Sequence, residues 1–529
     1  MRRVGESRDW LLPLVSGVVL PFAWPPFSVP VIPFVGLVPL LVWLSEARGP
    51  RELFRGGLAF ALPYMGGNLW GMAMLARFTL AGVPGFLGIL LVQLTTFFLF
   101  PVSLQAIRHA GVRAALPLAA PAAWVVSEHA RTFGDLAFAW VTLGYAPSGW
   151  PSLIQHADLI GVWGISFWLV LVNALAAEAW LRRQRGLGVA VALAGLAVAV
   201  VVPLAYGQVR MRQVATQLTG APTMQVAVVQ PNVAQERKWT VDAAEEIFAQ
   251  LNRQIAEAEA SSPDLVVGPE ASFPFAISES ATRLPEAVAS GVRPLLLGAV
   301  VGIGAGQPRS AGGLTYQVFS SHHNAAILAA ADRRILGRHD KQVLVPVTEQ
   351  IPYHEVLGFL LPAMRKQFGR FEPEAGLHVL DLPVAGGVAR IGTVICYETM
   401  FPELVRRLRD LGAEVVINVT NDAWFGRTTF PYQHVGFSVL RAIENRVAVV
   451  RAANTGISCV IDPLGRMSGN TALFEKATLI ARVPRTASRT PYARVGDVAV
   501  LLSYVVVVSL LAAAWVAHRR RRGVLGVKS

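Results

Sequence analysis

The stretch RIGTVICYETMFPE, residues 390–403, runs from a β-branched strand through a polar turn into the start of a helix. Its cysteine, Cys396, therefore stands at the end of a strand, where a side chain is presented at the edge of a sheet. The thiolate is the reactive form of cysteine, and a nearby helix N-terminus or cation lowers the thiol pKa. The pattern predicts a nucleophilic cysteine. A buried core cysteine, or a disulfide with Cys459, is the alternative.

The segment around this motif has the pattern of an α/β domain. Eight runs have the composition of strands: Gln225–Gln230, Leu265–Gly268, Leu295–Val301, Ala325–Ala330, Arg390–Cys396, Val415–Thr420, Val447–Arg451 and Cys459–Asp462. Helices are predicted near residues 242–255, 402–411 and 435–445, and the first has Asp242 and Glu245 as a variant capping box. Alternating strands and helices predict sheets that are covered by helices.

Two other stretches of this domain carry residues suited to acid–base chemistry. VVGPEASFP, residues 266–274, ends an apolar strand at Glu270, and GRHDKQVLVPVTEQIP, residues 337–352, carries Lys341 and Glu349. Only five of the 47 basic residues are lysines, so Lys341 suggests chemistry for which a guanidinium is unsuited, such as a compact charge at an oxyanion. Because each residue alone also fits a solvated surface position, the prediction depends on their combination.

Outside this domain the chain is apolar. The 529 residues are 53% hydrophobic and 15% charged, whereas roughly a quarter of an average globular protein is charged. Long apolar segments lie near residues 10–24, 30–44, 53–75, 83–107, 114–128, 158–180, 187–206 and 497–517. A spanning helix needs about 20 mostly apolar residues. We therefore expect a multi-span membrane domain of about eight transmembrane helices, of which the first two are short and rich in proline.

The basic residues predict how these helices are oriented. Of the 18 basic residues outside residues 208–496, 16 lie in alternate connections, and only Arg77 and Arg131 lie in the others. The positive-inside rule then places both termini in the cytoplasm and the α/β domain in a periplasm-like compartment. The net charge of +13 is mostly this topology signal, so no nucleic-acid partner is expected. The predicted parts are a membrane domain (1–207), the α/β domain (208–496), a C-terminal transmembrane helix (497–517) and a basic tail (518–529).

Taken together, the motifs of the α/β domain resemble the nitrilase superfamily of carbon–nitrogen hydrolases. They are GPE with Glu270, HDKQVLVP with Lys341, CYE with Cys396, TNDAWFG at residues 420–426, and PNVAQERKW, which ends at Trp239. With about eight spans around such a domain, the whole chain resembles one membrane-bound family closely, the apolipoprotein N-acyltransferases. The resemblance implies a four-layer αββα sandwich and a Glu–Lys–Cys triad.

Carried over residue by residue, the resemblance makes Glu270 the general base, Lys341 the cation of the transition state and Cys396 the acylated nucleophile. Supporting and substrate-binding roles fall on Trp239, Glu349, Tyr397 and Glu398. Val347 and Thr348 stand before Glu349 where the family commonly has an aromatic residue and a glycine. The local geometry of that loop is therefore left open.

The reaction implied by the resemblance is N-acylation. An acyl chain passes from a phospholipid to a cysteine thioester and then to the α-amine of the diacylglyceryl-cysteine of an apolipoprotein, with ping-pong kinetics. We expect a monomer in the inner membrane of a bacterium. Two alternatives are a membrane-tethered amidase or nitrilase-type hydrolase, and a transporter with a periplasmic binding domain, which the scarcity of intramembrane charges disfavours.

No metal and no organic cofactor is expected. GIGAG, residues 302–306, lacks the spacing of a dinucleotide site. His322 and His323 are adjacent, so on a strand they face opposite ways and are poor joint metal ligands.

One further apolar segment, residues 351–371, follows the candidate lysine. Its large apolar side chains include Phe359, Leu360, Leu361, Met364 and Phe368. A lid that admits acyl chains and an amphipathic helix packed on the domain fit this pattern equally well.

Overall fold

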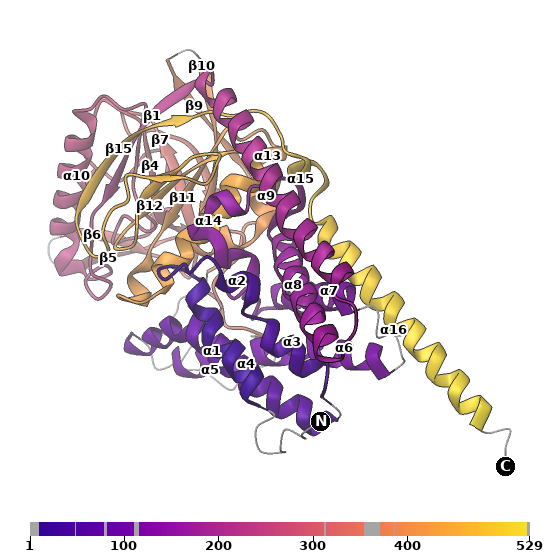
Figure 1. Cartoon of the computed structure of the whole chain (residues 1–529). Coiled ribbons are helices and arrows are strands. Elements are labelled where there is room, and N and C mark those ends of the chain that lie inside the picture. The colour runs from indigo at the N-terminus through magenta and orange to yellow at the C-terminus, as the bar shows by residue number, and fades with distance from the viewer. Residues whose placement is uncertain are drawn as a thin grey trace. The chain divides into compact units, whose positions relative to one another are not determined.

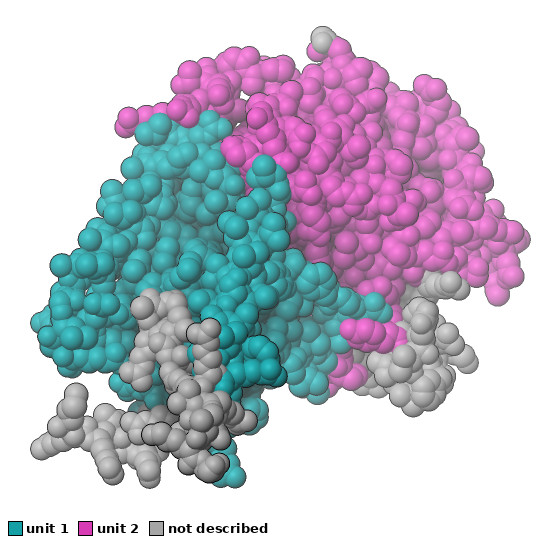
Figure 2. Space-filling view, turned by 90° about the vertical axis from the view of Figure 1, so that its right-hand side faces the viewer, with its two compact units in different colours: residues 1–70, 86–210, 495–529 teal, residues 71–85, 211–494 magenta. Residues whose placement is uncertain are grey.

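The computed structural model describes residues 10–47, 49–78, 82–109, 116–311, 314–346, 348–353, 371–385 and 387–525. Its contacts divide the chain into two compact units (Figure 2). The first unit comprises residues 1–70, 86–210 and 495–529, and the second comprises residues 71–85 and 211–494. Most of the apolar segment 351–371, residues 354–370, lies outside the described residues, so neither interpretation of it is tested.

Helices build the first unit. In chain order they are α1 (Leu11–Val19), α2 (Ile32–Val35), α3 (Val38–Leu44), α4 (Pro50–Leu69), α5 (Gly82–Phe97), α6 (Leu99–His109), α7 (Leu116–His129), α8 (Ala157–Gln184), α9 (Ala190–Thr219) and α16 (Val498–Leu525). The C-terminal helix α16 packs against α6, α7 and α8. The last apolar segment of the chain therefore packs against helices that the earlier apolar segments form.

Four helical stretches among the described residues are long and apolar enough to cross a membrane. They are Gly82–Arg108, Ala157–Gln184, Ala190–Thr219 and Val498–Arg519. Leu11–Ala23 and Ile32–Leu44 are shorter apolar helices, and the segment predicted near residues 53–75 changes from an α-helix to a 3-10 helix after Leu69. The structure thus supports four of the predicted spans, and the count of about eight stays a prediction.

Two β-sheets lie at the centre of the second unit (Figure 1). The first has the order β15-β1-β2-β4-β7-β8, with β3 also paired to β4, and the second has the order β14-β13-β12-β11-β10-β9. The strands of the first are β1 (Thr223–Gln230), β2 (Leu265–Val267), β3 (Ile277–Ser278), β4 (Leu295–Ile303), β7 (Ser321–Ala329), β8 (Ile335–Asp340) and β15 (Ala477–Pro484). Those of the second are β9 (Val379–Val384), β10 (Gly387–Ile395), β11 (Val415–Thr420), β12 (Ala448–Ala453), β13 (Cys459–Ile461) and β14 (Met467–Ser468). A separate hairpin is formed by β5 (Gln307–Ala311) and β6 (Leu314–Val318).

The two sheets face each other and helices cover their outer faces. Contacts join β1 to β12, β4 to β11 and β7 to β10. Helix α10 (Ala244–Glu259) packs on β1, β2 and β15, while α13 (Pro402–Asp410) and α14 (Phe430–Asn445) pack on the second sheet (Figure 1). Phe248, Leu251 and Ile255 of α10 recur at helical spacing and are buried against Val266 and Leu297 of the first sheet. This order of layers confirms the predicted αββα sandwich.

The local predictions have mixed outcomes. All eight predicted strands overlap observed strands, which are β1, β2, β4, β7 and β10 to β13, although their ends differ by up to four residues. The capping box predicted at Asp242 and Glu245 is wrong. A 3-10 turn, Val241–Ala243, precedes the α-helix, so Asp242 lies inside that turn, and no side chain caps the start of either element.

A glycine in β4 allows the turn that carries Glu270 to approach the strand closely. A Cβ atom at Gly298 would lie 2.5 Å from the Cα of Glu270 and 2.6 Å from the carbonyl oxygen of Pro269. The amide of Gly298 donates to that carbonyl at 3.0 Å, and the amide of Ser272 donates to the carbonyl of Gly298 at 2.7 Å. Only glycine fits this contact between two backbones.

Replacing Gly298 by alanine is expected to destabilise the protein by about 1–3 kcal/mol, because a methyl group must displace backbone atoms. Thermal unfolding of the detergent-solubilised chain measures the effect. Gly337→Ala in β8 is the matched control, since its new Cβ would first meet a terminal methyl of Leu380 at 3.0 Å, which can move. Equal melting temperatures for the two variants would contradict this account of the turn.

Candidate active site

Cys396 occupies a strained position directly after a strand. Strand β10 ends at Ile395, and Cys396 is the first residue of a 3-10 helix that ends at Met400. Its φ angle is 51°, in the left-handed region, which costs a residue with a side chain roughly 1–2 kcal/mol. Such a conformation persists only where the surroundings hold it.

A buried polar network contacts the backbone of this cysteine. The Nε2 atom of His434 lies 3.1 Å from the carbonyl oxygen of Cys396, and its Nδ1 lies 2.8 Å from Oδ1 of Asp422. Arg451 donates to Oδ2 of Asp422 at 2.8 Å. Burial alone would raise the pKa of Asp422, but Arg451 and His434 hold it at about 2. The ionised carboxylate therefore fixes the imidazole that faces the Cys396 carbonyl.

A second buried cluster contains the predicted base and cation. Asn324 donates through Nδ2 to Oε1 of Glu270 at 2.6 Å and to Oε1 of Glu349 at 2.8 Å. The ammonium of Lys341 lies 2.8 Å from both carboxylate oxygens of Glu349 and 3.5 Å from Oε1 of Glu270. All but Glu349 are at most 7% exposed. Two carboxylates, one amide and one ammonium thus form a single unit.

The electrostatics of the site determine the protonation of its nucleophile. Burial alone would lower the pKa of Lys341, but Glu349 and Glu270 raise it above its ordinary value, so the ammonium stays charged. Burial raises the pKa of the Cys396 thiol, Glu270 raises it further, and Lys341 lowers it. The net pKa is well above that of a free cysteine. At neutral pH the thiol is therefore mostly protonated, and only a small thiolate fraction is present at equilibrium.

Glu398 links the segment of the cysteine to the segment of the lysine. One carboxylate oxygen accepts the amide of Gln342 at 2.6 Å, and the other accepts the amide of Ile395 at 2.8 Å. These amides directly follow Lys341 and precede Cys396 in the sequence. The fully buried Glu398 side chain therefore holds the two segments in register.

The remaining predicted residues differ in how closely they join the cluster. Tyr397 is buried, and burial raises its pKa. Its ring contacts that of Phe401 edge-on, with 5.1 Å between the ring centroids. Trp239 is 45% exposed, and no hydrogen bond or ring contact among the described residues joins it to the triad. Glu270, Lys341 and Glu349 are thus in direct contact, and Cys396 is coupled to the first two by charge. Trp239 is largely exposed.

Several residues of the site were not found by sequence reasoning. Asn324, His434 and Arg451 were not singled out, whereas Asp422 of their network lies in the TNDAWFG motif, which gave no role for the individual residue. Lys238 did carry a signal, since it is another of the five lysines. It is buried and donates to the carbonyl oxygen of Glu270 at 2.9 Å, and burial lowers its pKa to about 8.

The two cysteines have different environments. Both are free thiols, so the disulfide alternative is wrong. Cys459 lies in β13 with no exposed surface, and burial raises its pKa to about 12. It is the core cysteine, whereas Cys396 lies beside charged groups.

Comparison with known proteins gives the class of this fold and site. Residues 225–492 match the model of the carbon-nitrogen hydrolase family, and residues 16–175 match that of the apolipoprotein N-acyltransferase N-terminal domain. The second unit therefore contains a carbon–nitrogen hydrolase domain. Among solved structures, a mutant of the Nesterenkonia AN1 amidase from the nitrilase superfamily is 17% identical, covers 54% of this chain and 99% of its own, and has a TM-score of 0.37.

Relatives along the whole chain define the family. The apolipoprotein N-acyltransferase of Geobacter metallireducens is 34% identical over 499 residues, covering 93% of this chain and 92% of the relative. The enzyme of the same name from Chlorobaculum tepidum is 30% identical and covers 92% of each chain. This chain belongs to the apolipoprotein N-acyltransferase family. It is an acyltransferase and a membrane protein.

The charges around Cys396 predict opposite effects of two substitutions on its reactivity. Glu270→Gln removes a negative charge and lowers the thiol pKa, so the thiolate fraction at neutral pH rises. Lys341→Met removes a positive charge and reduces that fraction. Each pKa unit changes the thiolate fraction about tenfold. Alkylation by iodoacetamide, followed by mass spectrometry of the Cys396 peptide, should be several-fold faster in the first variant and slower in the second.

The peptide of Cys459 is the internal control, because a fully buried thiol reacts only if the protein opens. Equal shifts in the same direction for both variants would show that the two side chains do not act on Cys396 through charge.

His434 is expected to act as a positioning residue. His434→Leu removes the donor to the Cys396 carbonyl, whereas His434→Gln keeps an amide N–H. A hydrogen bond worth about 1 kcal/mol corresponds to roughly a fivefold change in rate. We expect the leucine variant to lose at least that factor in the rate of acyl transfer at saturating lipid, with little change in KM, and the glutamine variant to recover part of it. A leucine variant with the wild-type rate would exclude this role.

Proposed function

We propose that this enzyme transfers an acyl chain from a phospholipid to the α-amine of the N-terminal diacylglyceryl-cysteine of apolipoproteins, through a thioester on Cys396. The observation that carries the proposal is the electrostatic coupling of a protonated cysteine to Glu270 and Lys341 in a buried cluster. Membership of the family and the four membrane-length helices support a lipid donor.

In the first half-reaction Glu270 removes the proton from the thiol. Its Oε1 accepts from Asn324 and faces Lys341, so Oε2 is the oxygen left for this task. The Cys396 thiolate attacks the ester carbonyl carbon, and Lys341 stabilises the negative oxygen that forms. When the carbon–oxygen bond breaks, the lysophospholipid leaves with the proton from Glu270, and a thioester remains.

In the second half-reaction the acceptor amine attacks the thioester. Glu270 takes a proton from the attacking nitrogen while Lys341 again stabilises the oxyanion. The carbon–sulfur bond breaks, an amide forms, and the proton held by Glu270 returns to the cysteine sulfur. A thioester suits this step because an amine displaces a thiolate more readily than an alkoxide. The donor product leaves before the acceptor reacts, so the kinetics are ping-pong.

The other predicted residues have supporting roles in this scheme. Glu349 orients the ammonium of Lys341 through two 2.8 Å contacts. Glu398 and the adjacent Tyr397 hold the turn of the nucleophile. Trp239, which is largely exposed, is assigned to substrate contact. The proposed chemistry needs no metal and no organic cofactor in the reaction itself.

We also propose the placement of the chain in a bacterial inner membrane. Residues 1–207 supply about seven spans, residues 208–496 form the periplasmic catalytic domain, and residues 497–517 form the last span before a basic cytoplasmic tail at 518–529. The distribution of basic residues supports cytoplasmic termini. A monomer suffices, because one chain carries every proposed catalytic group.

An alkyne-tagged phospholipid tests the proposal. The wild-type chain and Cys459→Ser should acquire a label that hydroxylamine removes, and Cys396→Ala should acquire none. Addition of a diacylglyceryl-cysteine peptide should discharge the label onto the peptide amine, as detected by mass spectrometry. Labelling of the Cys396→Ala variant would refute the nucleophile. Release of free fatty acid with no acylated peptide would instead indicate a hydrolase.

A further inference from the structure

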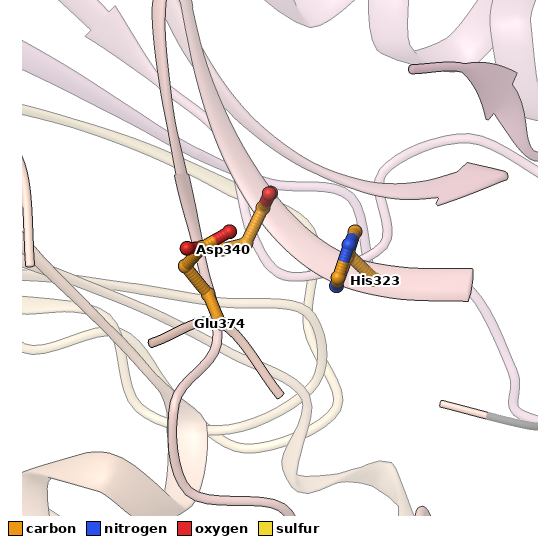
Figure 3. A group of neighbouring side chains, drawn as sticks. All are labelled: His323, Asp340 and Glu374. Carbon is orange, nitrogen blue, oxygen red and sulfur yellow. The ribbon is translucent and has the colours of Figure 1, made fainter. Parts of the chain in front are cut away.

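A further group of polar side chains, distinct from the catalytic cluster, comprises His323, Asp340 and Glu374 (Figure 3). His323 belongs to β7, Asp340 is the last residue of β8, and Glu374 lies in the segment before β9. One nitrogen or oxygen atom from each lies within 4.8 Å of the others. We propose that these three residues bind a divalent transition-metal ion, such as Mn²⁺ or Zn²⁺, that braces the active-site lysine. This departs from the expectation of a protein without a metal.

Asp340 supplies an oxygen that lacks a partner. The residue is 3% exposed, and its Oδ2 lies 2.8 Å from the guanidinium of Arg338. Its Oδ1 is buried and accepts no hydrogen bond from the residues that the structure describes. A carboxylate oxygen buried without a partner is costly. A cation among the three side chains would supply what this oxygen lacks.

The hydrogen bond of His323 leaves its Nε2 atom available as a metal ligand. Its Nδ1 lies 2.7 Å from the backbone carbonyl oxygen of Glu372, and a carbonyl can only accept, so Nδ1 carries the proton. The lone pair of neutral His323 is therefore on Nε2. Ligating histidines typically donate their second ring N–H to a carbonyl or carboxylate, which fixes the tautomer and the orientation of the ring.

The side chain of Glu374 is held in place by the backbone amides of the two residues that follow it. Its Oε1 accepts the amides of Ala375 at 3.1 Å and Gly376 at 3.3 Å, which leaves Oε2 for a ligand. The amide of Glu374 donates to the carbonyl oxygen of Lys341 at 3.0 Å. The third ligand is thus attached directly to the backbone of the lysine.

The donor set selects the kind of ion. The two carboxylates, of which Asp340 also binds Arg338, offer oxygen ligands to a divalent cation. One imidazole favours a transition metal over Mg²⁺ or Ca²⁺, which take oxygen ligands. Three protein ligands leave positions for water. The partners of His323 in the proposed site, Asp340 and Glu374, come from segments that sequence spacing does not reveal.

The position of the three ligands next to active-site residues indicates that the ion would have a structural role. Each ligand adjoins a group of the active site: Asn324 follows His323, Lys341 follows Asp340, and Glu374 binds the Lys341 backbone. The amide of Lys341 also donates to the carbonyl of Asn324 at 2.8 Å. Neighbouring residues of a strand point to opposite faces. An ion on one face would therefore hold in place the residues that act on the other.

Metal binding by the full-length, tag-free protein in detergent tests the proposal. After treatment with EDTA and removal of the chelator, Mn²⁺ is titrated and free ion is followed by electron paramagnetic resonance, and Zn²⁺ is added as a competitor. The wild type should bind one equivalent, and Mn²⁺ should raise its melting temperature. His323→Gln and Glu374→Gln should each weaken binding at least tenfold and lose the thermal shift.

His322→Gln is the matched control, because it removes an imidazole one position away and should bind as the wild type does. Far-UV circular dichroism checks that each variant is folded. His323 and Glu374 are partly exposed, so these variants remain decisive even if Asp340→Asn fails to fold. The absence of saturable binding of either ion to the wild type, or wild-type affinity in both the His323 and Glu374 variants, would overturn the proposal.

Discussion

The buried ammonium of Lys341 is the interaction on which the site depends. A lysine out of contact with water is stable as a cation only if anions surround it, and here Glu349 and Glu270 do so at 2.8 Å and 3.5 Å. The same cation lowers the pKa of a thiol that burial and Glu270 raise. In the proposed chemistry Glu349 has an indirect part, because it helps to keep Lys341 charged.

The sandwich brings these groups together from four separate segments. Glu270 follows β2, and Asn324 lies in β7. Lys341 and Glu349 lie in the connection after β8, and Cys396 follows β10. Two carboxylates tie the segments together, since Glu398 binds amides on both sides of the site and Asp422 fixes the histidine at the Cys396 carbonyl. The catalytic arrangement is thus held by buried charges as much as by the apolar core.

Much of this could be predicted from the sequence because the triad lies in local motifs. The strand before Cys396 and the apolar face of α10 follow from periodicity alone. Other features depend on residues distant in the sequence. Thr223 pairs with Pro484 across the β1–β15 ladder. The role of Asn324 depends on the fold in the same way, because only the folded sheet places its side chain between Glu270 and Glu349. The capping box failed for a local reason, a 3-10 turn that the pattern does not distinguish from a helix start.

The central claim is that Cys396, activated by Glu270 and Lys341, carries the acyl chain between two substrates. Intact-protein mass spectrometry of the wild type incubated with a single defined phospholipid, without acceptor, tests it most directly. The account predicts one population heavier by one acyl chain, located by fragmentation on Cys396, which returns to the unmodified mass when a diacylglyceryl-cysteine peptide is added. An acyl group on any other residue, or an adduct that the peptide does not discharge, would contradict it.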